Sequence, residues 1–190
     1  MPPRISFSRE SIIKAAFELV EERGLHELSA RKVAEKLNSS QAPIYTQFKN
    51  IEDLKDEVIV QGKELMFEYV KKPFTENPFL NIGVGISIFS RNHQNIFQAV
   101  SSKKETMVEV LDFLIEQMME DTRFTNVSVE KRKSLIKKMS ITTFGLVDMM
   151  AKGLVEDTRD EAIIQTLYEM GTAVIMAEFK LEGDKSKNEK

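Results

Sequence analysis

The chain has 190 residues, of which 42% are hydrophobic and 30% are charged. This balance is typical of a folded protein and too apolar for a disordered one. The absence of cysteine excludes disulfides, thiol catalysis and cysteine-ligated zinc, and the two histidines, His26 and His93, are too few for a histidine-built metal site. We therefore expect no metal and no other cofactor.

We expect neither an export signal nor a membrane anchor. The first residues, MPPRISFSRES, have no apolar core, and no apolar run approaches the roughly 18 residues that a membrane span needs. We expect a protein that stays in the cytoplasm.

Charge is unevenly divided along the chain. The net charge is −3, but residues 1–50 carry eight Lys and Arg against six Asp and Glu, whereas the remaining 140 residues carry 19 against 24. A weakly basic N-terminal segment on an acidic body suits DNA contact at one end of the protein. Chance asymmetry explains the charge distribution equally well.

The first 38 residues predict two helices. Ser8 is a suitable N-cap for the first helix, and Gly24 supplies a left-handed stop. A second helix of about nine residues begins at Ser29. Asn38 follows, and asparagine is one of the few residues besides glycine that tolerate the left-handed backbone of a tight turn.

A short third helix is predicted to begin at Ser39 or Ser40. Pro43 is the third or fourth residue after that cap, where its missing N–H would have little or no intrahelical partner. Ile44 and Phe48 are four residues apart and give this helix its buried face.

The rest of the chain predicts further helices. Asn50 caps a fourth helix that runs to about Val70. Residues 80–88 alternate between apolar and small or polar residues, which is a strand signal. A lone strand between helices would have no partner, so we predict a helix there. Three later stretches carry apolar residues at helical spacing: Met107–Met119, Ser128–Lys152 and Arg159–Leu181.

The connection Leu37–Ser40 between the second and third short helices describes a helix-turn-helix. With the apolar face of the third helix buried, the residues that would meet base edges in a major groove are Gln41, Ala42, Pro43, Thr46 and Gln47. The side chains suited to bind phosphate oxygens are Ser29, Tyr45 and Lys49, and Arg31 is suited to bind either a phosphate or a base. Ser40, at the expected helix start, completes the predicted DNA contacts. The alternative is an ordinary three-helix packing unit.

The segment Ile12–Leu54 carries a series of residues at fixed spacings: Ala15-Ala16, Gly24, Ser29, Val33-Ala34, Leu37, Ile44-Tyr45, Phe48 and Leu54. With these residues at these spacings and without a gap, the segment resembles the DNA-binding domain of the tetracycline-repressor (TetR) family of bacterial regulators. The resemblance covers about a quarter of the chain, and the rest agrees only in length and helical character. It implies contacts with phosphates and bases at the same positions named above, from Ser29 to Gln47.

Two residues depart from the family's pattern. Many members have Gly-Val where this chain has Asn38-Ser39, which the left-handed tolerance of asparagine accommodates. Many have a phosphate-binding lysine where this chain has Ile51. That contact is therefore expected only if Lys49 or Lys55 replaces it.

The resemblance also implies a homodimer and a small-molecule pocket. The last two long helices, about 128–152 and 159–181, would form a four-helix bundle with those of the partner. Candidate lining for an effector pocket comes from the middle helices: Phe89, His93, Phe97, Phe113, Met118, Phe144, Asp148 and Met149. Any one of these is more simply explained as core packing. A hydrogen bond in the dimer interface would explain Asp148 as well.

The sequence therefore predicts an all-α, TetR-like regulator. It would have a helix-turn-helix DNA-binding domain at residues 1–50, a helical effector-binding and dimerisation domain at 51–182, and a disordered tail at 183–190. As a dimer it would bind palindromic, double-stranded operator DNA, act as a repressor, and be released by a small, largely apolar effector.

The sequence leaves two other classes of function to consider. An enzyme is disfavoured, because Gly83-Val84-Gly85 lacks the third glycine of a dinucleotide loop and the sequence has no nucleophile elbow. A helical protein-interaction module that has lost DNA binding is the alternative, which Ile51 and the acidic balance permit.

Overall fold

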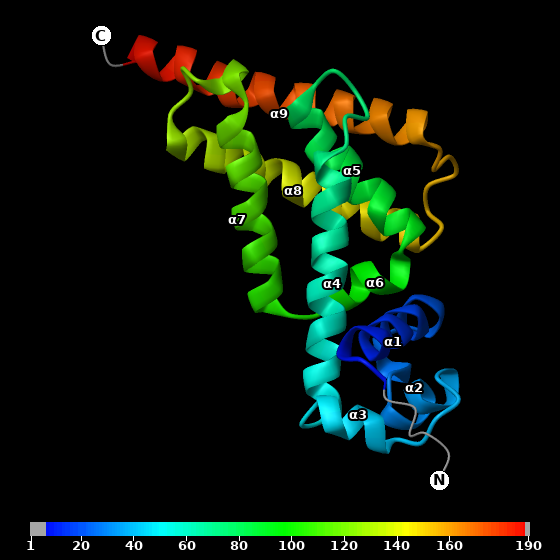
Figure 1. Ribbon diagram of the computed structural model, residues 1–190. Helices are drawn as coiled ribbons and strands as arrows, with labels where there is room; N and C mark the ends of the chain where they lie inside the picture. Colours follow the sequence, from blue (N-terminus) through cyan, green and yellow to red (C-terminus); the bar gives the residue numbers. More distant parts are fainter. Residues whose placement is uncertain (1–6, 189–190) are drawn as a thin grey trace. The chain divides into compact units, whose positions relative to one another are not determined.

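The computed structural model describes residues 7–188, with side chains described up to Phe179. Over that range it consists of helices and contains no strand, which confirms the all-α prediction (Figure 1). The α-helices are α1 (Arg9–Arg23), α2 (Ala30–Lys36), α3 (Ala42–Gln47), α4 (Ile51–Lys71), α5 (Pro78–Asn92), α6 (Gln94–Ser101), α7 (Lys104–Glu120), α8 (Val129–Ala151) and α9 (Asp160–Asn188). Two short 3₁₀ turns lie at Leu25–Glu27 and Thr122–Phe124.

The chain divides into two compact units. The N-terminal unit comprises Met1–Leu65 and His93–Thr106, and the C-terminal unit comprises Met66–Asn92 and Met107–Lys190. The sequence predicted a boundary at residue 50, whereas this division groups the first part of α4 and the whole of α6 with α1 to α3. A methyl group added to Gly62 of α4 would lie 2.6 Å from Cγ2 of Ile96 in α6. That contact joins residues far apart in the chain, so no local pattern around Gly62 indicates it.

The first two helices begin where the sequence predicts. The hydroxyl oxygen of Ser8 accepts a hydrogen bond from the Ser11 N–H at 3.2 Å, and that of Ser29 accepts one from the Lys32 N–H at 3.4 Å. Gly24 ends α1 with a φ of 85°. Asn38 has a φ of 50°, the only positive φ of a non-glycine residue in the described range. Each helix boundary therefore follows from the residue at its end.

The predicted start of α3 is wrong by two or three residues. The Ser39 N–H donates to the Ala34 carbonyl at 2.9 Å, so Ser39 still belongs to the turn that closes α2. Gln41 is the residue before α3, and Pro43 is the second residue of the helix rather than the third or fourth after its cap. α3 has six residues, and Ile44 is fully buried within it.

The start of α4 confirms the predicted cap. Oδ1 of Asn50 accepts a hydrogen bond from the Asp53 N–H at 2.9 Å, and Oδ2 of Asp53 accepts one from the Lys49 N–H at 3.2 Å. Two side chains therefore bond backbone amides that have no partner inside the helix. This arrangement fixes the direction in which the chain leaves α3.

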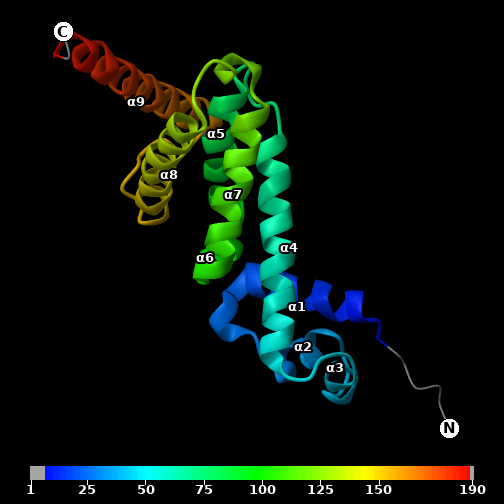
Figure 2. The same cartoon turned by 90° about the vertical axis from the view of Figure 1, so that its left-hand side faces the viewer.

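In the C-terminal unit, α5 packs against α8 and α9, which also lie side by side (Figures 1 and 2). The segment 80–88 is helical, as predicted despite its alternating pattern. The core contains buried apolar residues from α5 and α9: Leu80, Val84, Ile88, Ile163 and Leu167. Gly85 is required on α5 because a methyl group there would lie 2.5 Å from the carbonyl oxygen of Tyr69 in α4.

The chain's last helix extends beyond the predicted end. A disordered tail was expected at 183–190, but α9 continues to Asn188, and the last two residues lie outside the described range. Of residues 183–188, only Lys185 and Lys187 are good helix formers, so local helix propensity did not indicate this extension.

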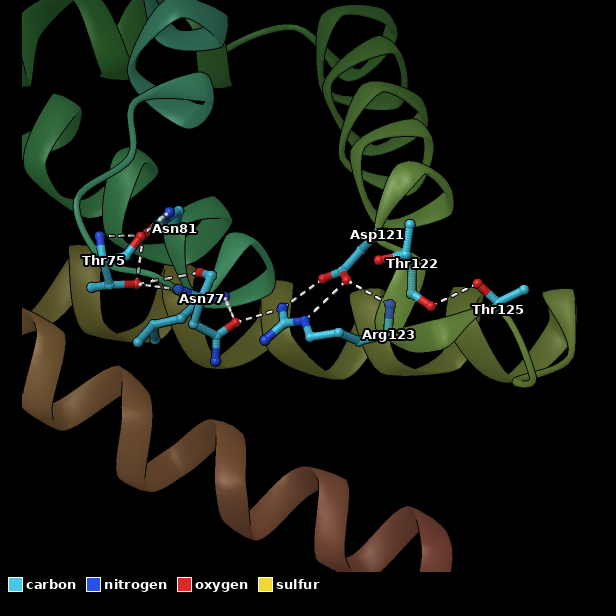
Figure 3. A network of polar contacts seen from close by, with 8 residues as sticks. Thr75, Asn77, Asn81, Asp121, Thr122, Arg123 and Thr125 are labelled. Atoms are coloured by element: carbon cyan, nitrogen blue, oxygen red, sulfur yellow. Dashed lines mark hydrogen bonds and ion pairs between the residues drawn. The ribbon is translucent and has the colours of Figure 1, made fainter.

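A polar network joins the start of α5 to the segment after α7 (Figure 3). Nε of Arg123 donates to Oδ1 of Asp121 at 3.0 Å, and Nη2 donates to Oδ2 at 2.5 Å. Nη2 also donates to Oδ1 of Asn77 at 2.7 Å, and the same oxygen accepts the Leu80 N–H at 3.1 Å. These hydrogen bonds from Arg123 hold the pKa of Asp121 below its ordinary value.

We predict that Gly85→Ala destabilises the protein by about 1–3 kcal/mol, because the new methyl group would meet the α4 backbone rather than a flexible side chain. Gly171→Ala is the matched control, since its methyl group would lie 3.5 Å from Cε of Met139, an ordinary contact. Urea unfolding at one protein concentration measures both. Equal stability of the two variants would contradict the close approach of α4 and α5.

Replacement of Asp121 by Asn should cost about 1–3 kcal/mol at neutral pH, because a charged hydrogen-bond partner of Arg123 is lost. Since the folded-state pKa of Asp121 lies below its unfolded value, the stabilisation is present above the unfolded pKa and disappears as pH falls through the folded one. The stability difference between parent and variant should therefore shrink below about pH 4. Chemical unfolding across pH tests this, with the exposed Asp112→Asn on α7 as control. A difference independent of pH would disprove the assignment.

Candidate nucleic-acid interface

The second and third helices form the predicted helix-turn-helix. Ile44 is fully buried and Phe48 is 4% exposed, so these two side chains hold the inner face of α3. The guanidinium of Arg9 lies 4.4 Å from the centre of the Phe48 ring and also pairs with Glu57 at 2.5 Å. α1, α3 and α4 are thereby tied together around Phe48.

The outer face of α3 presents most of the residues predicted to contact bases. Tyr45 is 52% exposed, and Pro43 is half-buried. The other exposed members of the predicted set on or beside this helix are Ser40, Gln41, Ala42, Thr46, Gln47 and Lys49. The Thr46 hydroxyl donates to the Ala42 carbonyl at 2.9 Å, which leaves its oxygen free to accept. The amide groups of Gln41 and Gln47 make no hydrogen bond to any described residue and can both donate and accept.

The side chains predicted to contact phosphates differ in whether they already have a partner within the protein. The Ser29 hydroxyl caps α2, and Arg31 is exposed but lies 3.5 Å from Glu35. Ile51 is half-buried at the first position of α4 and cannot replace the family's lysine. Of the two possible substitutes, Lys55 is bound to Glu52 at 2.8 Å, whereas Lys49 is exposed and has no ion pair within the described residues.

Acidic residues neutralise several cations of the N-terminal unit. Lys36 pairs with Glu22 at 2.8 Å and Glu18 at 3.4 Å, and its hydrogen bonds to these carboxylates raise its pKa. Lys32 pairs with Glu27. The positive charge of this unit is therefore concentrated on fewer side chains than the sequence count indicates.

The residues predicted to line an effector pocket are not brought together. Phe89 is fully buried with its ring centre 5.5 Å from that of Tyr69, and Met118 is 1% exposed. Phe113 stacks on Phe67 with ring centres 3.8 Å apart, and Phe144 is half-buried. Phe89 and Met118 therefore belong to the core of the C-terminal unit, whereas Phe113 and Phe144 are half-buried.

The other four predicted pocket residues also lie elsewhere. Asp148 is exposed and pairs with Lys152 at 2.7 Å, and Met149 is 46% exposed. His93 and Phe97 belong to the N-terminal unit, where Nδ1 of His93 lies 2.5 Å from Oε1 of Glu21 in α1. No shared site among the eight residues is therefore described.

The C-terminal unit instead has a cavity lined by residues from the start of α5, α7, α8 and α9, which we call the C-terminal cavity. Its volume is about 550 Å³, including the space open to solvent, and none of its sixteen lining residues is charged. The apolar lining includes Leu80, Ile82, Leu114, Ile136, Leu167 and Ile175. The polar lining is Asn77, Ser140, Thr143, Tyr168 and Thr172.

None of the eight residues predicted from the sequence lines this cavity. Gly83 and Gly171 line the cavity, and Ser140 and Thr143 follow each other at three-residue spacing on α8. Small residues leave space between helices, so a run of small and hydroxyl side chains on otherwise apolar faces is the signal that could have found it.

α8 and α9 expose a set of large apolar side chains. Ile141 is 67% exposed and Met176 is 63% exposed. Others on these two helices are Val129, Met149, Tyr168, Met170 and Phe179. A group of exposed apolar side chains on two packed helices is typical of a contact with another protein.

Two classes of feature are absent from the described residues. Within this part of the chain, no group of three or more His, Asp and Glu side chains could hold a metal ion. Over the same residues, every helix is too short or too polar to cross a membrane.

One family model matches the N-terminal part of the chain. Residues 12–58 match the sequence model of the bacterial regulatory proteins of the tetR family. No curated protein sequence matches the chain at a significant level.

Two solved structures are similar in fold. One is a tetR-family transcriptional regulator from Streptomyces coelicolor, with a TM-score of 0.69 and 14% identity over 94% of this chain and 85% of that one. The other is a TetR variant from Acinetobacter baumannii AYE in complex with minocycline, with a TM-score of 0.54 and 16% identity over 90% of this chain and 98% of that one.

Proposed function

Because this chain belongs to the tetracycline-repressor (TetR) family of bacterial regulatory proteins through its residues 12–58 and its fold, we propose that it represses transcription by binding palindromic operator DNA as a dimer. The observation that supports this proposal most strongly is the outer face of α3, where Gln41, Tyr45 and Gln47 are exposed around a buried Ile44. A bacterial chromosome lies in the cytoplasm, so we place the activity there.

The residues around α3 divide into two roles in this proposal. Gln41 and Gln47 read bases, because a glutamine amide can bond adenine through two hydrogen bonds. Ala42 and Pro43 pack on thymine methyl groups, and Thr46 offers a hydroxyl to either kind of base.

Contacts with phosphates position α3 in the groove. Tyr45 and Lys49 are exposed beside α3 and can each reach a phosphate oxygen. Ser29, Arg31 and Ser40 contribute at the start of α2 and in the turn before α3, and Lys49 takes the place of the lysine that Ile51 replaces. Such contacts hold the register without reading sequence.

The proposed dimer forms through the exposed apolar side chains of α8 and α9. Ile141 and Met176 are more than half exposed, and burying them against a second copy would remove apolar surface from water. A two-fold dimer presents two copies of α3, which must be about 34–36 Å apart to meet successive major grooves.

An effector in the C-terminal cavity would change the separation of the two α3 helices in the dimer. α6 begins two residues after α5 ends, so the helix that lines the cavity continues almost directly into one that contacts α1. In the N-terminal unit, His93 contacts the Glu21 carboxylate, and Nδ2 of Asn95 donates to the Glu21 carbonyl at 2.9 Å. A near-complete switch requires a roughly 10⁴-fold preference of the effector for the DNA-free arrangement.

A second candidate is a protein-interaction module without DNA binding. The pairing of Lys32 and Lys36 with glutamates favours it, because it reduces the charge available to phosphates. The two functions differ in how binding depends on salt. Affinity for DNA falls steeply as the salt concentration rises, because salt reduces the free energy gained when counterions are released from the DNA.

We predict that Tyr45→Ala weakens binding to all duplexes by at least about tenfold, because a phosphate contact is lost in both subunits. Gln47→Ala should instead change the preferred base at one position of each half-site, with about 1–3 kcal/mol less discrimination. Binding of both variants to a set of duplexes differing at single positions measures this, with the exposed Gln61→Ala on α4 as control. If Tyr45→Ala binds as tightly as the parent, the assignment of α3 fails.

Replacement of Ile141 or Met176 by Glu should dissociate the dimer, because two charges would be buried without partners at the two-fold contact. The matched control is Val108→Glu on α7, which places the same charge at a side chain that is 48% exposed outside α8 and α9. Sedimentation equilibrium gives the mass of each variant. A monomeric parent protein, or variants that remain dimeric, would refute this interface.

A further inference from the structure

We propose that the C-terminal cavity selects an uncharged, mainly apolar molecule carrying a carbonyl-type hydrogen-bond acceptor, and that Asn77 is the residue that recognises this acceptor. The inference deepens the proposed function and rests on it only in treating this molecule as the effector. The binding preference itself follows from the lining of the cavity.

The ligand is uncharged because the cavity has no counterion to offer. None of the sixteen lining residues is Asp, Glu, Lys, Arg or His. A carboxylate or ammonium group taken from water into this lining would lose its hydration without gaining an opposite charge. The middle of the lining is apolar, with Ile82, Leu114 and Ile136 among its members, and suits a hydrocarbon body.

Hydrogen bonds fix the orientation of the Asn77 amide. Its Oδ1 accepts from the Leu80 N–H at 3.1 Å and from Nη2 of Arg123 at 2.7 Å. Arg123 is held in turn by both carboxylate oxygens of Asp121. A flipped amide would turn its N–H groups toward these two donors, so the oxygen must stay on this side.

The Asn77 nitrogen is the part of this amide that remains available to a ligand. Figure 3 shows Nδ2 on the side of Asn77 away from Arg123, and no described residue accepts a hydrogen bond from it. Because Asn77 lines the cavity and its oxygen is already used, it offers two N–H donors. A bound molecule must therefore bring an acceptor to this end.

Two buried hydroxyl groups support a polar contact at a second point. Ser140 and Thr143 line the cavity at 7% and 1% exposure, and neither hydroxyl is hydrogen-bonded to any described residue. Other hydroxyls on helices of this unit donate to the carbonyl four residues earlier, as that of Ser87 does at 2.9 Å and that of Thr172 at 2.8 Å. Both hydroxyls are therefore available to a molecule bound in the cavity.

The two polar points are separated along α5. A methyl group on Gly83 would lie 3.0 Å from Oγ1 of Thr143, which places that hydroxyl beside Gly83. Asn77 precedes Gly83 by six residues, or about 9 Å along a helix axis. A rigid two-ring molecule with one carbonyl group has a length of this order.

The test compares probes with one carbon skeleton and different polar groups. Acetylnaphthalene carries a neutral carbonyl acceptor, naphthoate carries a charge, and naphthalene carries neither. Equilibrium dialysis against the full chain at neutral pH gives the three dissociation constants. We expect acetylnaphthalene to bind at least about tenfold more tightly than either of the others, which is the effect of one well-formed hydrogen bond. Equal affinities, tighter binding of naphthoate, or binding of none of the three would overturn the proposal.

The variant Asn77→Asp tests the N–H donors of Asn77 without removing its acceptor oxygen. Aspartate keeps an oxygen for the Leu80 N–H and for Arg123, and it is a good N-cap, so α5 should remain folded. It replaces the N–H groups with a second acceptor. Acetylnaphthalene should then bind at least about tenfold more weakly, while naphthol, which carries a donor, should bind at least as tightly as before. Asn126→Asp, at an exposed position away from the cavity, should change neither.

The outcomes separate this inference from the proposed function. Thermal unfolding establishes that Asn77→Asp is folded, and unchanged probe preferences in the folded variant would overturn the role of Asn77. Operator binding is measured without any probe. A chain that binds operator DNA but shows no preference for the carbonyl probe would contradict only the inference, whereas one that shows the preference but binds no DNA would contradict only the proposed function.

Discussion

The burial of Ile44 and Phe48 is the constraint on which the proposed function depends. α3 has only six residues, so two inward side chains four residues apart determine its rotation and leave Gln41, Tyr45 and Gln47 outside. Phe48 also lies under the Arg9 guanidinium, which pairs with Glu57 of α4. The burial of these two side chains, together with the contacts of Arg9, thereby fixes the face of α3 and its attachment to two longer helices, which is the rigidity that reading bases requires.

The packing around α5 in the C-terminal unit explains why its sequence alternates as that of a strand would. Residues two apart on a helix are separated by about 200° around the axis, so Gly83 and Gly85 lie on opposite sides of α5. One side admits the α4 backbone beside Tyr69, and the other borders Thr143 and the C-terminal cavity. The apolar residues of the segment 80–88 are buried on every side of the helix, because α5 is packed between other helices of the unit. Small residues therefore serve close packing on one side and an open space on the other.

Features set by neighbouring residues could be predicted from the sequence, and those set by distant contacts could not. The caps at Ser8, Ser29 and Asn50 bond amides three residues away, so the starts of α1, α2 and α4 were predictable. The start of α3 was misplaced because the Ser39 N–H bonds back to Ala34. The effector candidates were drawn from the middle helices, and those such as Phe89 and Phe113 pack against other aromatic rings, while the cavity forms where side chains are small.

The central claim is that α3 reads a DNA sequence, and selection from a random duplex library at near-physiological salt tests it most directly. The purified chain is mixed with the library, and the bound duplexes are sequenced. We expect enrichment of a palindrome whose half-site centres lie about one helical turn, or a multiple of it, apart, with binding that weakens steeply as salt is raised. If no sequence is enriched, and lowering the salt restores no binding, α3 is not a recognition helix and the account fails.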